Sequence, residues 1–445
     1  MLLCVSCSAT GPAPAEGALS RGATAVAQEE GPPRQRGLVP VPTSYDSRDL
    51  YLSGDWEGRR TSLAEQGLQI GASLTQVGQD VVDGGREEGF EYGAKLETDW
   101  ILDLDRSGTI PGGLLTMRTE SRAGDSVNRA AGVVLPVNDV LYFPLTDEPD
   151  EDIPLAITEL RYTQFLSKSV GVFIGKFTPL GGDVNEFAGG RGDTQFMSHA
   201  FLTASVTALV NPYSTLGAGA IWLPSKDVVV TSSVFSAYDS STTSGLSHLD
   251  EGLIWTGSLR GQYECGELPG GMLLTVQYGF DNEFVDFEGS FVGGGGVRIP
   301  LEDDTWNAVW NMWQYLQVEP GSNEKVDVTN SRTDREGFGV FARAAVADRD
   351  TNPVRFSVSG GVAGRGILPG RDRDSAGLGF AYSEAQEEPL VTGTLLDTAS
   401  RRTELYYSIH LGYGSELTFD CQWADPLLAK MDPALIFGFR LRTQF

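Results

Sequence analysis

The stretch that decides the fold is "PALIFGFRLRTQF", residues 433–445, at the end of the printed chain. Phe437 and Phe439 alternate there with Arg440 and Arg442. Successive side chains leave a β-strand on opposite faces, so this alternation predicts a strand with one apolar face and one cationic face. Such a strand suits a soluble sandwich, in which the apolar face meets a core. It equally suits a membrane barrel, in which the apolar face meets lipid and the other face meets a wet lumen.

The same alternation of polarity recurs along the chain and predicts about sixteen strands. The strand candidates are residues 68–79, 91–105, 114–122, 157–166, 170–177, 214–223, 227–238, 252–264, 272–283, 305–318, 336–347, 354–365, 375–384, 402–413, 415–424 and 433–445. So many strands in one chain indicate either several soluble β domains or one large closed barrel.

The lengths of the connections favour the barrel. Outer-membrane barrels join neighbouring strands alternately by short periplasmic turns and long external loops. Tight links are expected near residues 106–113, 167–169, 224–227, 266–271 and 413–415, and long links at 124–156, 178–213, 239–251, 284–304 and 385–401. Two links break this rule, since 319–335 is long and 348–353 is short. We therefore expect an all-β, transmembrane antiparallel barrel in the outer membrane, closed by pairing of the last strand with the first.

Composition limits the function classes. The chain has 445 residues, 55 glycines and a formal net charge of -27. Acidic residues gather in segments read as loops, such as 147–154, which argues against a nucleic-acid partner and is typical of a solvated acidic surface. No apolar run approaches the roughly 18 residues of a membrane-spanning helix. Cys4 and Cys7 have C-x-x-C spacing without a second pair, so we expect no metal site and no cofactor.

We divide the chain into three parts. Residues 1–50 are expected to be a targeting segment and a Pro-rich linker, with an A-x-A site before Gln28 or, alternatively, a lipoprotein-type Cys7. Residues 51–67 are expected to hold a short helix from Trp56 to Gln66, capped by Asp55 and ended by Gly67. Residues 68–445 are expected to form the barrel.

Sorting the strand residues by face predicts a lumen of mixed charge. The inward-facing arginines are Arg118, Arg122, Arg161, Arg260, Arg343, Arg355, Arg365, Arg440 and Arg442, and the inward-facing acids are Glu97, Asp99, Glu120, Glu159, Glu404 and Asp420. A lumen with both signs suits polar neutral solutes as well as ions. We expect Arg118, Arg122 and Arg161 to reach the narrowest point, because they face inward on neighbouring strands.

Two further segments are candidates for the pore constriction. The stretch from Thr178 to Tyr213 is long enough to fold inward, and it carries Asp183 and Arg191. The strand 305–317 places Trp313 on one face with several amides, where it could lie against the apolar face of a sugar. The alternative is that its aromatics form the girdle at the membrane interface.

At this point the chain resembles the carbohydrate-selective porins of the OprB type. The segments that carry the resemblance are "SGDWEGRRTSLAEQGLQI" (53–70), "TELRYTQFLSKSVGVFIGKFTP" (158–179), "GRGILPGRDRDSAGLGFAYSE" (364–384), "TELYYSIHLGYGSELTFDCQWADP" (403–426) and "FGFRLRTQF" (437–445). The resemblance runs from about residue 51 to the end. It implies a sixteen-stranded outer-membrane porin that passes carbohydrates by diffusion through an arginine-bearing constriction. We expect carbohydrates and membrane lipid as its partners and a monomer or a homotrimer as its assembly.

Four other function classes use comparable β structures. A general, non-selective porin would show the same strands. A barrel enzyme needs paired catalytic groups, yet His199 and His248 lie apart from His410, which shares a face with Ser408. A transporter with an internal plug uses about 22 strands, for which this chain is too short. A soluble carbohydrate-binding β protein is the fourth class.

Overall fold

The structure is a computed structural model. The residues that it describes are 37–41, 50–146, 151–208, 210–287, 291–293, 296–298, 300–320, 326–327, 332–333, 335–387 and 396–445. The predicted targeting segment, with Cys7 and the A-x-A site, lies outside the described residues.

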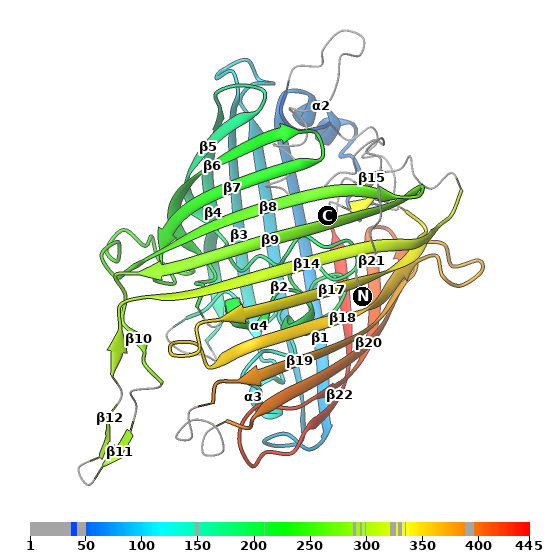
Figure 1. The fold of residues 1–445 in the computed structure, drawn as a ribbon. Helices are drawn as coiled ribbons and strands as arrows, with labels where there is room; N and C mark the ends of the chain where they lie inside the picture. Colours follow the sequence, from blue (N-terminus) through cyan, green and yellow to red (C-terminus); the bar gives the residue numbers. More distant parts are fainter. Residues whose placement is uncertain are drawn as a thin grey trace.

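Sixteen strands form one closed antiparallel barrel (Figure 1). They are β1 (Leu68–Asp83), β2 (Gly89–Asp103), β3 (Gly113–Gly124), β4 (Ile153–Phe165), β5 (Val170–Phe177), β6 (Thr215–Ser225), β7 (Val228–Ser236), β8 (Leu253–Cys265), β9 (Leu268–Phe280), β14 (Thr305–Val318), β17 (Gly337–Ala347), β18 (Val354–Arg365), β19 (Ser375–Ala385), β20 (Ala399–Gly412), β21 (Ser415–Ala424) and β22 (Ala434–Gln444). The predicted fold class is confirmed, and each strand overlaps its predicted segment.

Three small hairpins lie in the connections between barrel strands. β10 (Phe284–Val285) pairs with β13 (Leu301–Glu302), β11 (Phe291–Gly293) pairs with β12 (Gly296–Arg298), and β15 (Val326–Asp327) pairs with β16 (Arg332–Thr333). β10, β11 and β12 project from the barrel at the lower left of Figure 1.

The barrel closes where the last strand meets the first. Thr75 of β1 lies opposite Arg442 of β22, and Val77 lies opposite Arg440. This pairing leaves neither strand with an open edge, which a membrane-spanning sheet requires. Phe437 is 49% exposed on the outer surface, whereas Arg440 is buried inside. The alternation that opened the sequence analysis therefore separates lipid-facing from lumen-facing side chains.

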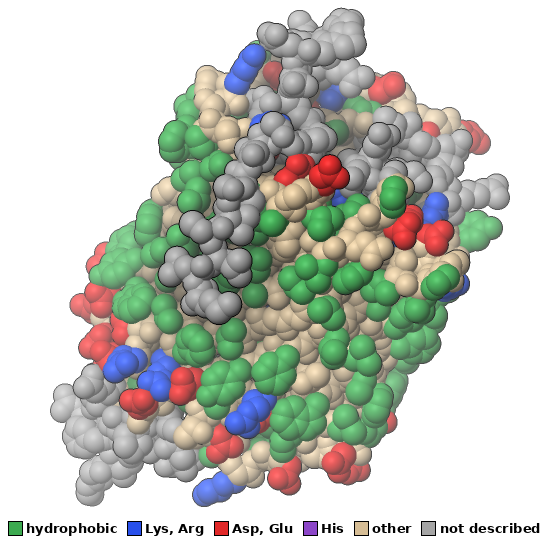
Figure 2. Space-filling view, turned by 45° about the vertical axis from the view of Figure 1, so that its right-hand side comes forward, with side chains coloured by type: hydrophobic (Ala, Val, Ile, Leu, Met, Phe, Trp, Pro, Cys, Tyr) green, Lys and Arg blue, Asp and Glu red, His purple; other side chains and the backbone are tan. Residues whose placement is uncertain are grey.

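The outer surface of the barrel is apolar across the middle of the strands. Figure 2 shows hydrophobic side chains over that region and most of the charged side chains nearer the two ends. Trp306 and Trp310 of β14 are 43% and 40% exposed on this surface. None of the described helices is both long and apolar enough to cross a membrane.

Apart from the short 84–88 link between β1 and β2, the connections alternate in length largely as predicted. Links such as 226–227, 266–267 and 413–414 are tight, while 125–152 and 178–214 are long. The two exceptions are real features of the fold, because β14, β17 and β18 occupy the predicted strand segments. The 319–336 connection is therefore a long link on the short-turn rim, and 348–353 is a short link on the opposite rim.

The N-terminal helix is shorter than predicted. α2 runs over Arg59–Glu65 and begins three residues late, because Trp56 and Glu57 adopt left-handed backbone angles with φ of 51° and 59°. The N-cap residue is Gly58 and not Asp55 as predicted, although the Asp55 carboxylate accepts the Thr61 amide hydrogen at 2.8 Å near the helix start. Gly67 follows the helix with a φ of 102°, as predicted for its end.

A buried arginine ties this helix to the end of the chain. Arg60 donates from Nη2 to the Phe445 carbonyl oxygen at 2.6 Å, and its guanidinium lies 4.0 Å from the Tyr51 ring centroid. The other helical turns among the described residues are short. They lie in the 125–152 and 178–214 connections and are α3 (Asn128–Ala131), η1 (His199–Phe201) and α4 (Ser205–Ala208).

Candidate pore constriction

The 178–214 connection folds into the barrel. Its apolar side chains pack on the inner wall of the strands from β14 to β20, where Phe196 makes edge contacts with Phe341 and Tyr406 at centroid distances of 5.4 and 4.9 Å. Phe187 packs in the same way on Trp313 and Tyr315. A loop that buries its apolar side against the inner wall crosses the lumen and narrows it. We refer to residues 178–214 as the constriction loop.

Three charged side chains of the barrel wall hold the backbone and one carboxylate of the constriction loop. Arg440 of β22 donates to the carbonyl oxygens of residues 192, 194 and 195, at 2.5 Å for Gly192 and 3.0 Å for Gln195. Glu404 of β20 accepts the amide hydrogens of residues 197 and 198 at 2.6 and 2.9 Å. Arg343 of β17 donates to Asp183 at 2.7 Å. These are charge-assisted bonds between buried groups, so the loop position is strongly specified.

The 125–152 connection also enters the lumen and packs beside the constriction loop. Arg122 of β3 donates from Nη1 to the carbonyl oxygens of Leu141 and Tyr142 at 2.8 and 3.3 Å. The two connections meet directly, because the Phe143 ring stacks on Tyr213 with a centroid distance of 4.4 Å. Together they occupy the part of the lumen next to β1 and the strands from β17 to β22.

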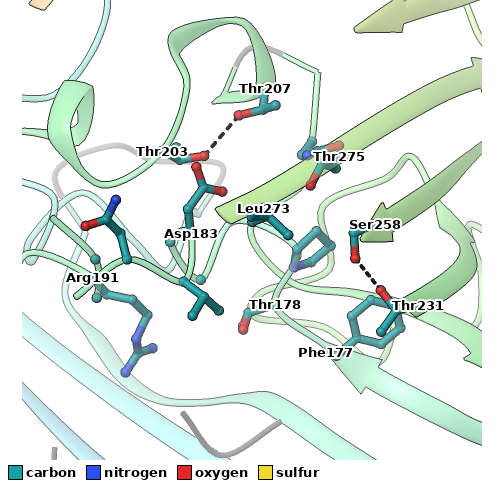
Figure 3. Close-up of a pocket in the computed structure, with 18 of the residues that line it drawn as sticks. Phe177, Thr178, Asp183, Arg191, Thr203, Thr207, Thr231, Ser258, Leu273 and Thr275 are labelled. Atoms are coloured by element: carbon teal, nitrogen blue, oxygen red, sulfur yellow. Dashed lines mark hydrogen bonds between the residues drawn. The ribbon is translucent and has the colours of Figure 1, made fainter. Parts of the chain in front are cut away.

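A cavity of about 530 Å³ lies beside these connections. Its walls are the inner faces of the strands from β2 to β9, with contributions from β14 and β22, and the constriction loop (Figure 3). Asp183 and Arg191 of the loop line one side in that view, while Thr231, Ser258 and Thr275 come from the barrel wall.

One wall of the cavity carries alternating charges. Arg118 lies between three carboxylates, with its Nε 2.8 Å from Asp99 Oδ1 and 3.6 Å from Glu97 Oε1, and its Nη1 3.8 Å from Glu159 Oε2. The Glu159 carboxylate also pairs with Arg161 Nη2 at 3.1 Å. This pattern follows from the strand register, in which Asp99, Arg118 and Glu159 lie opposite one another on β2, β3 and β4.

The constriction loop extends this charged wall. Arg191 pairs with Glu97 and with Glu120, at 2.8 Å for the latter. Asp193 faces Arg442 at 3.3 Å. Burial alone would raise the pKa of the Asp193 carboxyl, but the positive charges of Arg442 and Arg191 outweigh burial and hold that pKa below its usual range. Asp193 is therefore a carboxylate at any pH at which the pore works.

The opposite wall carries two rows of uncharged polar side chains, and Arg260 of β8 lines the cavity beside them. Thr231 of β7 lies opposite Ser258 of β8, which lies opposite Thr275 of β9. The neighbouring row consists of Ser233, Thr256 and Gln277. Figure 3 shows the hydrogen bond between Thr231 and Ser258, which is 2.5 Å long. We call these six side chains, which are five hydroxyls and the Gln277 amide, the hydroxyl rows.

The sequence analysis missed the hydroxyl rows. The available signal was the alternation of Thr and Ser with apolar residues in 228–236 and 253–265. That alternation identifies strands but cannot align them, because the alignment depends on the register between neighbours.

An apolar patch of the barrel wall borders the hydroxyl rows. It includes Phe173 and Phe177 of β5 and Phe235 of β7, all of which line the cavity. The Arg161 guanidinium lies 5.8 Å from the Phe173 ring centroid. Among the described residues, Nε and Nη1 of Arg161 have no hydrogen-bond partner. Aromatic faces and polar donors therefore lie side by side in this part of the cavity wall.

The structure divides the ten predicted site residues into two groups. Seven line the cavity: Arg118, Glu159, Arg161, Asp183, Arg191, Trp313 and Arg442. The other three, Glu120, Arg122 and Arg440, face inward as predicted, and they bond to the two connections that fill the lumen. Trp313 lies inside the barrel beneath Phe187, so it is no part of the outer girdle to which Trp306 and Trp310 contribute.

Residues 87–445 match the family model described as "Carbohydrate-selective porin, OprB family". The chain belongs to this family. It is therefore an outer-membrane carbohydrate porin, a channel and not an enzyme, as the resemblance predicted. The match begins after the segment 53–70 on which part of that resemblance rested.

Solved structures agree with the OprB fold. The chain is similar to Pseudomonas putida OprB at high pH, with a TM-score of 0.75, 18% identity, and coverage of 90% of this chain and 100% of that one. The low-pH structure of the same protein gives a TM-score of 0.56 at 14% identity, with 90% and 100% covered. The outer membrane channel DcaP of Acinetobacter baumannii gives 0.50 at 9% identity, with 85% and 97% covered. No curated protein sequence matches the chain.

Proposed function

We propose that carbohydrates and similar small polar solutes cross the outer membrane through the cavity between the charged wall and the hydroxyl rows. The single observation that carries this proposal is the placement of paired charges opposite uncharged hydroxyls across one narrow space. A sugar hydroxyl both donates and accepts hydrogen bonds. The charged wall offers guanidinium donors beside carboxylate acceptors, so each sugar hydroxyl finds a partner of either kind without a net attraction for one sign of ion.

The seven cavity residues differ in their proposed roles. Arg118, Arg161 and Arg442 are donors to solute hydroxyls, and Glu159 is an acceptor that lies beside two of them, Arg118 and Arg161. Asp183 and Arg191 present charges from the constriction loop. Trp313 contributes an apolar edge to the cavity.

Glu120, Arg122 and Arg440 act on the pore indirectly in this proposal. Each is buried and bonded to a connection that narrows the lumen. Replacing one of them is therefore expected to change the width of the pore, whereas replacing a cavity donor changes how a sugar binds within it.

The first experiment is a single-channel recording of the purified, refolded protein in a planar bilayer, titrated with glucose and longer glucans. We expect stable openings that sugar blocks at roughly millimolar concentration, since a freely passing solute has to bind weakly in order to leave. Openings that sugar leaves unchanged would indicate a general porin instead, and folded protein without openings would contradict both.

The conducting unit in this proposal is the single chain. β1 pairs with β22 within one chain, so each chain encloses its own lumen. The alternatives for the assembly are a monomer and a homotrimer. Chemical cross-linking of the protein in outer membranes distinguishes them, as do conductance steps that occur singly or in threes.

A further inference from the structure

A short piece of the N-terminal segment lies inside the mouth of the barrel. Residues 37–41 are described ahead of the barrel, and Leu38 and Val39 are only 6% and 2% exposed. They pack in one cluster with side chains from the inner wall, among them Ile101 and Leu114. We refer to residues 37–41 as the strap.

The turn between β2 and β3 binds the strap backbone through three side chains. Asp103 accepts the amide hydrogens of Leu38 and Val39 with one oxygen, at 2.6 and 3.0 Å, and Asp105 accepts that of Gly37 at 3.1 Å. Arg106 donates from Nη2 to the Val39 carbonyl oxygen at 2.7 Å. Gln69 of β1 adds a bond of 2.8 Å to the carbonyl oxygen of residue 40. Each residue from 37 to 40 therefore makes at least one hydrogen bond from its backbone to a side chain of the barrel.

These contacts place the strap at the periplasmic end of the pore. The β2–β3 connection lies on the rim that carries the tight 226–227 and 266–267 turns. Tight turns face the periplasm in outer-membrane barrels, and the longer loops face outward. The start of β1, with Gln69, lies on the same rim.

The inner wall is apolar beside the strap, in contrast to the charged wall above it. Along β2 the inward side chains change from Glu97 and Asp99 to Ile101, followed at the end of the strand by Asp103, whose carboxylate binds the strap. β6 ends in the same way, with Ile221 and Leu223 inside. A water-filled lumen is normally polar, so an apolar inner surface is stable only when something covers it. Here Leu38 and Val39 cover it.

The strap also lies next to the proposed solute path. Phe173 and Ile221 lie toward the periplasmic ends of β5 and β6, where both line the cavity, and both belong to the cluster that buries Leu38 and Val39. These two side chains connect the cavity wall with the strap cluster. A solute that leaves the cavity toward the periplasm meets this cluster.

We propose that residues 37–41 partly close the periplasmic exit of the pore and that the channel conducts more when the strap leaves its site. The site is a peptide-binding groove made of an apolar wall and the Asp103–Asp105–Arg106 turn. This inference relies on the chain being a porin and goes beyond it, because it adds a second narrowing at the exit that the chain itself supplies.

The test compares single-channel conductance of the wild type with the variant Leu38→Asp/Val39→Asp, in which two carboxylates oppose burial of the strap. If the exit and the constriction contribute equally to the resistance, conductance rises about twofold. The matched control is Leu52→Asp/Leu368→Asp, which adds the same charge at residues that are about half exposed, at 51% and 50%, and is expected to conduct like the wild type. Equal conductance of the folded strap variant and the wild type would overturn the proposal.

A second experiment asks whether an added peptide can replace the strap in its groove. A capped peptide with the sequence of residues 37–41, GLVPV, is added to one side of the strap variant and then to the other. We expect it to lower the conductance from the periplasmic side alone, whereas the peptide GDDPV does not. If the charged variant fails to fold, Leu38→Gly/Val39→Gly is used, since it removes the apolar contacts without burying charge. No effect of GLVPV on either open variant contradicts the groove, and sugar block of the wild type reports the porin function separately.

Discussion

Tyr213 donates its phenolic hydrogen to Glu120, whose two carboxylate oxygens lie 2.8 and 2.9 Å from the tyrosine oxygen. Burial, together with the negative charge of Glu120, raises the pKa of Tyr213 well above its usual range, so the phenol remains a donor. Glu120 also accepts from Arg191 at 2.8 Å and lies 3.7 Å from Lys95 Nζ. One fully buried carboxylate thus joins the barrel wall to the constriction loop at two of the loop's residues.

We predict that Glu120→Gln destabilises the protein more than Tyr213→Phe. The first change leaves Lys95 and Arg191 without their shared negative charge and should cost about 3–5 kcal/mol of unfolding free energy. The second removes one hydrogen bond to a charged acceptor, worth about 1.5–3 kcal/mol. Guanidinium unfolding of the protein refolded in lipid vesicles, followed by tryptophan fluorescence, measures both.

The double variant tests whether these residues act together. Because the two groups are in contact, the effects of the single changes should not add. Additive losses would mean that the bond contributes nothing to the attachment of the loop.

Arg343 provides a second prediction, about the width of the pore. Its side chain binds Asp183 at 2.7 Å and donates to the carbonyl oxygens of Ala188 and Phe201 at 3.2 and 3.1 Å. Arg343→Ala removes all of these bonds, so the constriction loop should move and the single-channel conductance should increase and become noisier.

The matched control for Arg343 is Arg355→Ala on the next strand. Arg355 is also an arginine of the barrel wall, but it pairs with Glu384 and Glu387. We expect its loss to leave the conductance unchanged. If both variants conduct alike, Arg343 does not set the width of the pore.

The sequence determined which face of each strand meets lipid, but it did not determine which inward residues reach the solute. Alternation alone placed Phe437 outside and Arg440 inside, because strand geometry fixes the faces. Arg122 and Arg442 were equally good candidates for the constriction on that basis. Arg442 lines the cavity and Arg122 does not, because the connection that follows β3 folds back into the lumen and covers Arg122. Contacts of this kind depend on tertiary packing, which local patterns do not encode.

The start of the helix shows the same limit on a smaller scale. The spacing of Asp55 and the following residues predicted the cap, yet the helix begins at Arg59. The buried Arg60 bonds to the last residue of the chain, Phe445. A contact between two residues so far apart in the sequence cannot be predicted from a local sequence pattern.

A third prediction concerns the hydroxyl rows. Replacing Thr231 and Thr275 by valine and Ser258 by alanine removes the hydroxyls of one row without enlarging any side chain. Sugar block should weaken, because each lost hydrogen bond contributes about 0.5–1.5 kcal/mol, while ion conductance should change little. Sugar titration of single channels measures the effect, and Thr119→Val on the outer face is the control. A triple variant with wild-type sugar block would exclude the hydroxyl row from the binding path.

The last prediction concerns the acidic outer rim, where Glu302 and Asp348 lie near other carboxylates. Loss of hydration raises the pKa of Glu302, and the negative charges of Asp286 and Asp350 raise it further. Loss of hydration also raises the pKa of Asp348, and Asp350 adds to that effect, although a hydrogen bond from the Asp350 backbone opposes it. Because a raised pKa favours the neutral acid, this rim loses negative charge at a higher pH than free carboxylates do. We therefore expect a preference for cations at neutral pH and low salt that begins to decline, as the pH falls, before free carboxylates would titrate, and that disappears in 1 M salt.

The reversal potential in a KCl gradient measures this preference at each pH. The variant Glu302→Gln/Asp348→Asn should show a smaller preference at neutral pH and a weaker pH dependence than the wild type. Its control, Glu319→Gln/Asp372→Asn, removes the same charge from the opposite rim, where the connections 319–336 and 366–374 lie. Because exposed charges act over only about 10 Å at 0.1 M salt, each rim influences ions at its own mouth. Equal responses of the two variants would mean that overall charge, and not the outer rim, sets the selectivity.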